Sequence, residues 1–251
     1  MRLKGKVVII TGGARGLGKA YALGMAKEGA RIVAADIVDG AEVIDEIKKN
    51  GGDAISFPTD VSDERSVEAM ARAAVEKFGR IDVLINNAAL FTALGKKPFH
   101  QVSAEEWDRV QAVNVKGTFL CCKAVYPQMK KQGKGKIINI SSATFHQGTP
   151  YFIHYVTSKG GIVGFTRALA REVGDDGISV NAIAPGLTVS ESVQGSAMYP
   201  EAALKAVAGG RCFKRDETAD DLMGMAIFLA SDESDFITGQ TYIVDGGVMF
   251  G

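Results

Sequence analysis

The chain has few of the features that mark secreted, membrane or nucleic-acid-binding proteins. Its 251 residues include three cysteines, an odd number with neither a metal-ligand spacing nor a Cys-x-x-Cys pair. The 29 basic and 29 acidic residues cancel, so charge gives no argument for nucleic acid or a membrane surface. No apolar run approaches the roughly 18 residues of a membrane span, and a signal peptide is missing. We therefore expect a soluble, cytoplasmic protein with reduced thiols.

Histidine is also scarce. His100, His146 and His154 show no ligand-like spacing, and single histidines are usually loop or helix-cap residues. We expect no metal site.

Glycine, by contrast, is frequent, with 30 residues, and four of them, Gly12, Gly13, Gly16 and Gly18, follow the first apolar run. That run, residues 6–11, is uninterrupted, as in a parallel strand buried on both faces. The turn Gly12-x-x-x-Gly16-x-Gly18 then leads into a helical pattern. Such a turn lets the backbone approach a pyrophosphate at the N-terminus of a helix. The spacing differs from Gly-x-Gly-x-x-Gly, and a plain strand-to-helix connection is the alternative.

The second predicted strand ends at Asp36, near the distance at which a carboxylate accepts hydrogen bonds from the adenosine ribose. The same charge repels a 2′-phosphate, and Ile37 follows where a basic residue would favour NADP. We therefore predict NAD. Arg15 in the glycine turn could reach such a phosphate, although we favour a solvated arginine.

Two further strands end in candidate cofactor contacts. Asp60 and Val61 follow the third strand, where they could hold the adenine ring, or Asp60 could cap a helix beginning near Ser62. The fourth strand ends in small and amide residues at 86–89, which would let a cofactor lie against the backbone.

A long helix is predicted from Ser103 to about Lys131, opened by a capping box with Glu106. It contains Asn114, a polar amide in an apolar stretch, which must be hydrogen-bonded if it is buried. Its partner is either the backbone or a bound water that leads to Lys159, which would make a proton path.

The stretch 141–159 contains the residues best suited to proton transfer. Tyr155 and Lys159 lie one turn apart on the same face of a helix. A nearby ammonium favours the phenolate and lowers a tyrosine pKa from its usual value of about 10. Ser142 ends a predicted strand, and the following loop could bring its hydroxyl beside the phenol to hold a substrate oxygen. Tyr-x-x-x-Lys alone is short enough to occur by chance on a surface helix.

Taken together, the motifs resemble the short-chain dehydrogenase/reductase family over essentially the whole chain. The residues that carry the resemblance are Thr11, Gly12, Gly16, Gly18, Asp60, Asn86, Asn87, Ala88, Asn114, Ser142, Tyr155, Lys159, Pro185 and Gly186.

The resemblance implies one α/β domain over residues 1–251, a Rossmann-type doubly wound parallel sheet of about seven strands with helices on both faces. It implies a catalytic tetrad in which Tyr155 is the acid or base and Ser142 positions the substrate oxygen. Lys159 would lower the tyrosine pKa and bind the nicotinamide ribose, and Asn114 would hold a relay water. The C-terminal sequence resembles that of family members that assemble as tetramers, which implies a homotetramer.

The resemblance also implies a set of NAD-binding residues. Ala89 departs from the usual glycine, and Ser190 stands where a threonine often contacts the carboxamide, with Thr188 nearby. The expected set is Gly12, Arg15, Gly16, Leu17, Gly18, Asp36, Ile37, Asp60, Val61, Asn87, Ala88, Ala89, Tyr155, Lys159, Pro185, Gly186, Thr188 and Ser190.

The predicted substrate pocket is mostly apolar or aromatic. Residues 187–213 show weak periodicity, which is typical of a lid. Expected pocket residues are Ser142, Thr144, Phe145, Tyr151, Leu187 and Met198, with Phe91, Leu94, His146, Phe152 and Tyr199 as further candidates.

Such a pocket suits a hydrophobic or aryl secondary alcohol or ketone, and the chain is similar to NAD-dependent bacterial alcohol dehydrogenases of the 1-phenylethanol type. One alternative is a 3-oxoacyl-(acyl-carrier-protein) reductase. Such reductases usually take NADPH, which Asp36 disfavours. A pyridoxal 4-dehydrogenase and a non-catalytic NAD sensor are the others.

Overall fold

Seven parallel strands form one sheet in the computed structural model, which describes residues 1–191, 193, 194, 196 and 198–250. The strand order is β3-β2-β1-β4-β5-β6-β7, which confirms the predicted doubly wound sheet. The strands are β1 (Val7–Thr11), β2 (Arg31–Asp36), β3 (Asp53–Pro58), β4 (Val83–Asn86), β5 (Gly135–Ile140), β6 (Ile178–Pro185) and β7 (Thr241–Val244).

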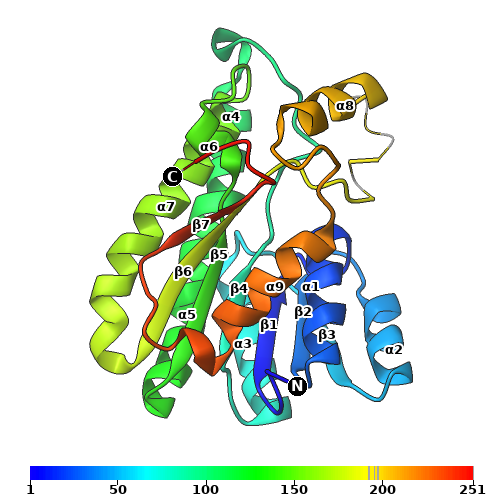
Figure 1. Cartoon of the computed structure of the whole chain (residues 1–251). Helices are drawn as coiled ribbons and strands as arrows, with labels where there is room; N and C mark the ends of the chain where they lie inside the picture. The colour runs from blue at the N-terminus through cyan, green and yellow to red at the C-terminus, as the bar shows by residue number, and fades with distance from the viewer. Residues whose placement is uncertain (192, 195, 197, 251) are drawn as a thin grey trace.

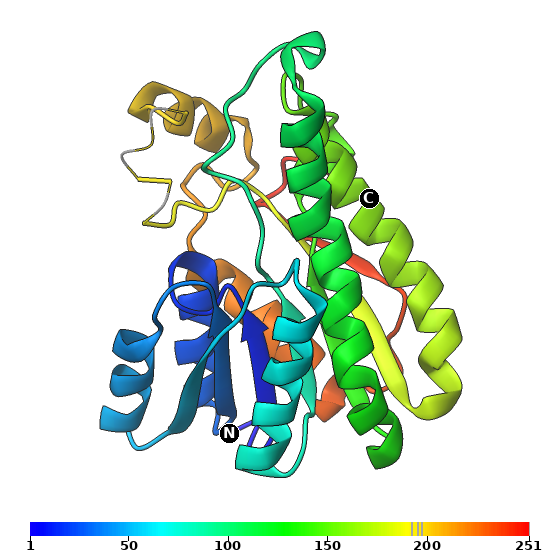
Figure 2. The same cartoon turned by 180° about the vertical axis from the view of Figure 1, so that it is seen from behind.

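Helices cover both faces of the sheet (Figures 1 and 2). One face packs against α1 (Gly16–Lys27), α2 (Ala41–Lys49) and α9 (Ala219–Ala230). The other packs against α3 (Glu64–Phe78), α5 (Gly117–Gln132) and α7 (Ile153–Val173). Central strands therefore bury side chains on both faces, which explains their uninterrupted apolar sequences. None of the helices in the described ranges is long and apolar enough to cross a lipid bilayer.

The direction in which the strands are added reverses between β1 and β4. Ile9 of β1 pairs with Val33 of β2 on one side and with Leu84 of β4 on the other. The loops that follow these two strands diverge, which leaves a crevice at the carboxyl ends, the usual place for a ligand in such sheets.

The long helix predicted from Ser103 is three consecutive elements: α4 (Ala104–Gln111), a π-helical turn at Ala112–Lys116 and α5. Ser103 caps α4 by accepting a hydrogen bond from the backbone N–H of Glu106. The reciprocal half of the predicted capping box is wrong. The Glu106 carboxylate instead binds the Lys97 ammonium at 2.6 Å and His154 Nε2 at 3.2 Å, because a cation is a stronger partner than a backbone N–H.

Two helices occupy segments that the sequence predicts as irregular. Helix α6 (Ala143–Gln147) begins directly after Ser142, and α8 (Glu201–Gly210) follows Pro200. Single 3₁₀ turns complete the secondary structure at η1 (Phe99–Gln101), η3 (Gly174–Asp176) and η4 (Asp232–Ser234).

Candidate active site

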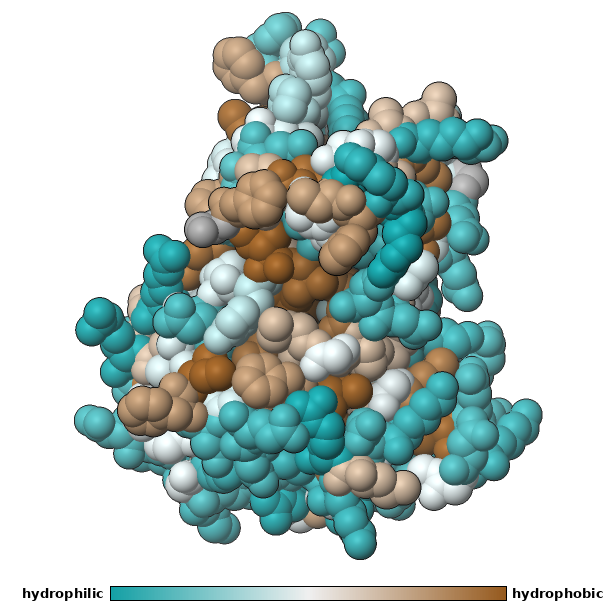
Figure 3. Space-filling view, in the orientation of Figure 1, coloured by the Kyte–Doolittle hydropathy of each residue, from teal (hydrophilic) through white to brown (hydrophobic). Residues whose placement is uncertain are grey.

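A cavity of about 1390 Å³ opens at the carboxyl ends of the strands. Apolar residues gather in a hollow in the middle of this face of the molecule (Figure 3). Most of the residues predicted for the site line the cavity: Gly12, Arg15, Gly16, Leu17, Asp36, Ile37, Asp60, Val61, Asn87, Ala88, Ala89, Phe91, Ser142, Thr144, Tyr155, Lys159, Pro185, Gly186, Leu187, Thr188, Ser190 and Tyr199.

The glycine turn is shaped for close approach to a ligand. Gly12 and Gly16 have φ angles of 64° and 54°, which side-chain-bearing residues rarely adopt. Helix α1 begins at Gly16, and the side chain of Arg15 makes no capping hydrogen bond there. The first N–H groups of α1 are therefore available to an anion such as a pyrophosphate. Gly18 lies behind the turn and does not line the cavity, since a Cβ on it would collide with the carbonyl oxygen of Gly12.

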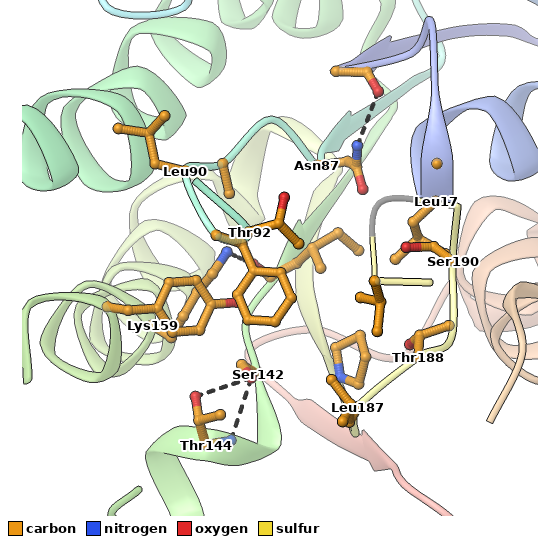
Figure 4. Close-up of a pocket in the computed structure, with 18 of the residues that line it drawn as sticks. Leu17, Asn87, Leu90, Thr92, Ser142, Thr144, Lys159, Leu187, Thr188 and Ser190 are labelled. Carbon is orange, nitrogen blue, oxygen red and sulfur yellow. Dashed lines mark hydrogen bonds between the residues drawn. The ribbon is translucent and has the colours of Figure 1, made fainter. Parts of the chain in front are cut away.

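Residues after β4 hold the glycine turn in place. The Asn87 amide donates hydrogen bonds to the carbonyl oxygens of Thr11 at 2.9 Å and Gly12 at 3.2 Å. The backbone N–H groups of Asn87 and Ala88 both donate to Thr11 Oγ1 at 3.0 Å. Figure 4 shows a hydrogen bond donated by the side-chain amide of Asn87. Sequence reasoning gave Asn87 a cofactor contact, and the structure adds that its side chain fixes the shape of the turn.

Asp36 ends β2 at the edge of the same cavity. The residue is 7% exposed, and its carboxylate accepts hydrogen bonds from the N–H groups of Ala14 and Val38 at 3.1 and 3.2 Å. Each oxygen keeps acceptor capacity for a ribose hydroxyl. Ile37 beside it is 71% exposed. With the open N-terminus of α1, this arrangement fits a nicotinamide dinucleotide cofactor.

Asp60 lines the cavity but does not cap α3. Its Oδ1 accepts hydrogen bonds from the N–H and hydroxyl of Ser62 at 2.8 and 2.6 Å. Helix α3 begins at Glu64 and is capped by Asp63. The capping alternative is therefore wrong.

Tyr155, Lys159 and Ser142 meet at the other end of the cavity. Lys159 Nζ lies 5.6 Å from the centre of the Tyr155 ring and donates to the carbonyl oxygen of Ile140 at 2.8 Å. Ser142 caps α6, and its Oγ accepts hydrogen bonds from the N–H and hydroxyl of Thr144 at 3.3 and 3.0 Å. Figure 4 shows Ser142 and Lys159 on one side of the pocket, and Leu187 and Thr188 on the other.

Burial dominates the proton affinities of these groups. It raises the pKa of Tyr155, and a hydrogen bond with Ser142 acts in the opposite direction. Burial also lowers the pKa of Lys159 to about 8. The expected lowering of the tyrosine pKa by Lys159 is therefore not found in the protein alone, because the desolvation of the phenol is the larger effect.

Asn114 is buried in the π-helical turn, where it bonds to the backbone, one of the two alternatives left open by the sequence, and also to a serine side chain. Its Oδ1 accepts from the N–H of Leu90 at 2.8 Å, and its Nδ2 donates to Ser158 Oγ at 3.0 Å. Ser158 in turn donates to the carbonyl oxygen of Tyr155 at 2.7 Å. The amide thus joins the segment after β4 to α7, and Asn114 is not among the residues that line the cavity.

Sequence reasoning missed a buried ionic cluster beside Thr188. Thr188 Oγ1 donates to Glu217 Oε1 at 2.7 Å, and Arg211 Nη2 lies 3.7 Å from Glu217 Oε2. Burial raises the pKa of Glu217 to about 7. Arg211 also donates to the carbonyl oxygens of Leu187 at 2.9 Å and Asp245 at 3.1 Å. An Arg and a Glu in an irregular segment show no periodic pattern, so the sequence offered no signal for them.

Three predicted pocket residues, Phe145, Tyr151 and Met198, are not among the residues that line the cavity. Phe145 is turned by α6 against Gly160 of α7 and the ring of His146, which is also outside the lining. Tyr151 is 61% exposed. Met198 packs behind the lining. The same cluster contains Leu94 and Phe152, two of the further candidates.

Aromatic rings form the wall beside Tyr155. The ring centres of Phe91 and Tyr155 are 5.1 Å apart, and those of Phe91 and Tyr199 are 5.9 Å apart. Phe152 stacks on Tyr155 from behind at 4.8 Å. The pocket next to the phenol is therefore apolar and aromatic.

The sheet topology, glycine turn and acidic end of β2 define a dinucleotide-binding protein of the Rossmann class. The chain belongs to the short-chain dehydrogenase/reductase family of oxidoreductases. The family model described as enoyl-(acyl carrier protein) reductase matches residues 12–249. The dehydrogenases of this family use nicotinamide cofactors and small-molecule substrates.

Curated relatives at similar identity differ in their named substrates. A glucose 1-dehydrogenase of Bacillus subtilis is 40% identical over 252 residues, 98% of this chain and 95% of the relative. A 3-oxoacyl-(acyl-carrier-protein) reductase of Thermotoga maritima is 39% identical over 257 residues, 99% and 100% of the two chains. A protein named as a galactose dehydrogenase of Rhizobium meliloti is 38% identical over 249 residues, 98% and 96% of the two chains.

A solved structure agrees with the fold. A crystal structure described as a short-chain alcohol dehydrogenase of Sinorhizobium meliloti 1021 has a TM-score of 0.92 and 33% sequence identity, and covers 98% of this chain and 97% of its own.

Proposed function

We propose that the protein transfers a hydride between NAD(H) and a secondary alcohol or ketone with a hydrophobic or aromatic body, with Tyr155 as the acid or base. The observation that carries the proposal is the buried phenol, which lies against an aromatic wall and has Lys159 on its face, while Ser142 acts to lower its pKa. When bound, the nicotinamide accepts or supplies the hydride.

The residues around the phenol have separate roles in this proposal. Ser142 Oγ donates a hydrogen bond to the substrate oxygen, and Tyr155 Oη gives the proton to a ketone or removes it from an alcohol. Lys159 binds the nicotinamide ribose, and its ammonium form favours the phenolate. Asn114 holds α7 and the segment after β4 in register through Ser158 and Leu90.

The proposal of NAD rather than NADP rests on Asp36 and Ile37. A buried carboxylate at the end of β2 accepts hydrogen bonds from ribose hydroxyls and repels a 2′-phosphate. Residues 187–213, which include α8 and of which 192, 195 and 197 lie outside the described residues, are proposed as the substrate lid of a single catalytic domain.

A second candidate is reduction of 3-oxoacyl thioesters, which the Thermotoga maritima relative favours by its name. Asp36 argues against this second candidate where the reductant is NADPH, because its carboxylate repels the 2′-phosphate.

The test is a comparison of initial rates with NAD and NADP. The panel contains 1-phenylethanol, pyridoxal, D-glucose, D-galactose and a 3-hydroxyacyl thioester. Tyr155→Phe removes the proton donor, and Tyr126→Phe, whose hydroxyl bonds to Asp176 outside the cavity, is the matched control.

We expect aryl alcohol turnover with NAD, and a loss of about 10²–10⁴-fold in kcat in Tyr155→Phe with NADH binding retained. Turnover of the 3-hydroxyacyl thioester with NADP would favour the second candidate. Tight NADH binding without turnover of any compound would favour an NAD sensor, and full turnover by Tyr155→Phe would exclude the acid–base role.

A further inference from the structure

The substrate end of the cavity contains a cation without a carboxylate partner in the described part of the chain. Lys96, in the loop after β4, lines the cavity and is exposed. Its ammonium nitrogen lies 5.2 Å from the centre of the Tyr199 ring. Tyr199 is next to Phe91, and Phe91 is next to Tyr155. A continuous row of aromatic rings therefore links the Lys96 ammonium to the phenol.

The neighbouring lysine has a different role. Lys97 forms an ion pair with Glu106 at 2.6 Å, and the same carboxylate contacts His154. Its charge is thus neutralised within the structure, and Lys97 does not line the cavity. Of two adjacent lysines, only Lys96 presents its charge to the cavity.

Acidic side chains of the lining are engaged away from Lys96. Asp36 and Asp60 lie at the ends of β2 and β3 and accept local N–H groups. Asp245 accepts from the N–H groups of residues 247–249. Glu191 interacts electrostatically with Lys19 of α1. Among the described lining residues, none therefore competes for the Lys96 ammonium.

We infer that Lys96 forms a subsite for an anionic group of the substrate, so that the substrate is an aryl or otherwise apolar ketone or alcohol carrying a carboxylate. This inference rests on the proposed function, since it places the reacting carbon at Tyr155 and the carboxylate at the far end of the aromatic row. The apolar body lies against Phe91 and Tyr199, and the charge is held by Lys96. Neutral sugars would use neither feature.

The test uses pairs of ketones that differ only in a carboxylate, at two lengths. The short pair is acetophenone and 4-acetylbenzoate, and the long pair is 4-acetylbiphenyl and 4′-acetylbiphenyl-4-carboxylate. The value of kcat/KM is measured with NADH for the wild type, Lys96→Met and Lys96→Arg. Lys49→Met, at the C-terminal end of α2 and outside the cavity lining, makes the same change in net charge and is the matched control.

In the wild type, the carboxylate member of at least one pair should be preferred by about fivefold, the upper range for a solvent-exposed ion pair. Lys96→Met should remove the preference and leave the neutral ketone within about twofold of its wild-type value. Lys96→Arg and Lys49→Met should keep the preference, and 0.5 M NaCl should weaken it in the wild type.

Two outcomes would overturn the inference: the same preference in Lys96→Met, or no wild-type preference for the carboxylate member of either pair. If none of the ketones is reduced, the proposed aryl substrate fails separately. The dissociation constants of the four compounds, measured by calorimetry with the NADH-bound protein, then decide on Lys96. Tighter binding of a carboxylate in the wild type but not in Lys96→Met supports the subsite, and equal or absent binding of the carboxylates overturns it.

Discussion

The two ends of the cavity are built by different forces. At the cofactor end, backbone groups and short polar side chains hold the turn after β1, as in the bonds from Asn87 to Thr11 and Gly12. At the substrate end, the rings of Phe91 and Tyr199 form the wall by packing. Hydrogen bonds fix positions to a few tenths of an ångström, whereas apolar packing tolerates exchange of side chains of similar volume. The cofactor end should therefore be more sensitive to a single added methyl group. At the substrate end, the wall should tolerate exchange, and loss of the polar group that holds the substrate oxygen should have the larger effect.

After Tyr155→Phe, the largest effect is expected from the serine that holds the substrate oxygen. Ser142→Ala should lower kcat/KM for the best alcohol by about a hundredfold, because a hydrogen bond aimed at the reacting oxygen is lost. Initial-rate kinetics measure it. Thr144→Val is the control, since Thr144 donates to Ser142 without reaching the substrate in the proposed mechanism. Equal losses in both variants would contradict the role of Ser142.

A methyl group in the glycine turn should act mainly on stability and cofactor binding. In Gly18→Ala, the new Cβ collides with the carbonyl oxygen of Gly12 and lies 2.7 Å from Asn87 Nδ2. We expect a loss of about 2 kcal/mol in the free energy of unfolding, and NADH binding about tenfold weaker. Denaturant unfolding and NADH fluorescence measure the two effects.

Gly164→Ala is the matched control for this exchange. Gly164 lies inside α7, and its Cβ would meet no atom within 4 Å. Alanine there should stabilise the protein by about 0.5–1 kcal/mol through its higher helix propensity. A loss of stability as large as in Gly18→Ala would show that the crowding at Gly12 is not the cause.

Removing the carboxylate at the end of β2 should change the preference between NAD and NADP and leave the substrate pocket intact. Asp36→Ala should shift the ratio of kcat/KM for NADP to that for NAD upward by about tenfold, because repulsion of a 2′-phosphate is lost together with the ribose contact. Thr59→Ala, in the loop directly after β3, is a neighbouring control. An unchanged ratio in Asp36→Ala would mean that Asp36 does not face the ribose.

The smallest expected effect is the contribution of Glu217 to the pH dependence of the free energy of unfolding. Its pKa is about 7 in the folded protein, compared with 4.5 for a free side chain. The folded state therefore binds the proton more tightly, and the stabilisation is complete below pH 4.5 and is lost as the pH rises through about 7. Between pH 6 and 8, the wild type should lose about 1 kcal/mol relative to Glu217→Gln. Thermal unfolding of both proteins across this range measures it, and parallel curves would exclude the contribution.

The sequence predicted the cofactor end well because its signals are local. The glycine turn, the uninterrupted apolar strands and Asp36 each follow from a few consecutive residues, and the structure places them as expected. Asn87 shows the limit of this reasoning. Its pairing with the turn after β1 joins residues 76 positions apart, which no local pattern reveals.

The substrate end was predicted less well for the same reason. Phe145 and Tyr151 are aromatic residues close in sequence to Tyr155, yet α6 turns Phe145 onto α7 and Tyr151 points to solvent. Lys96 lines the cavity while Lys97 does not, although the two are adjacent and chemically identical. The choice between them depends on where Glu106 and Tyr199 lie in space.

The sequence by itself determined the parallel α/β sheet, the glycine turn and the placement of Tyr155 and Lys159 on one helical face, because these depend on periodicity, backbone freedom and spacing within one element. Only the tertiary structure decided the proton affinity of Tyr155, the anchoring of Thr188 by Glu217 and the open charge of Lys96. Those properties depend on burial and on partners contributed by distant segments, and burial exists only when the chain has folded.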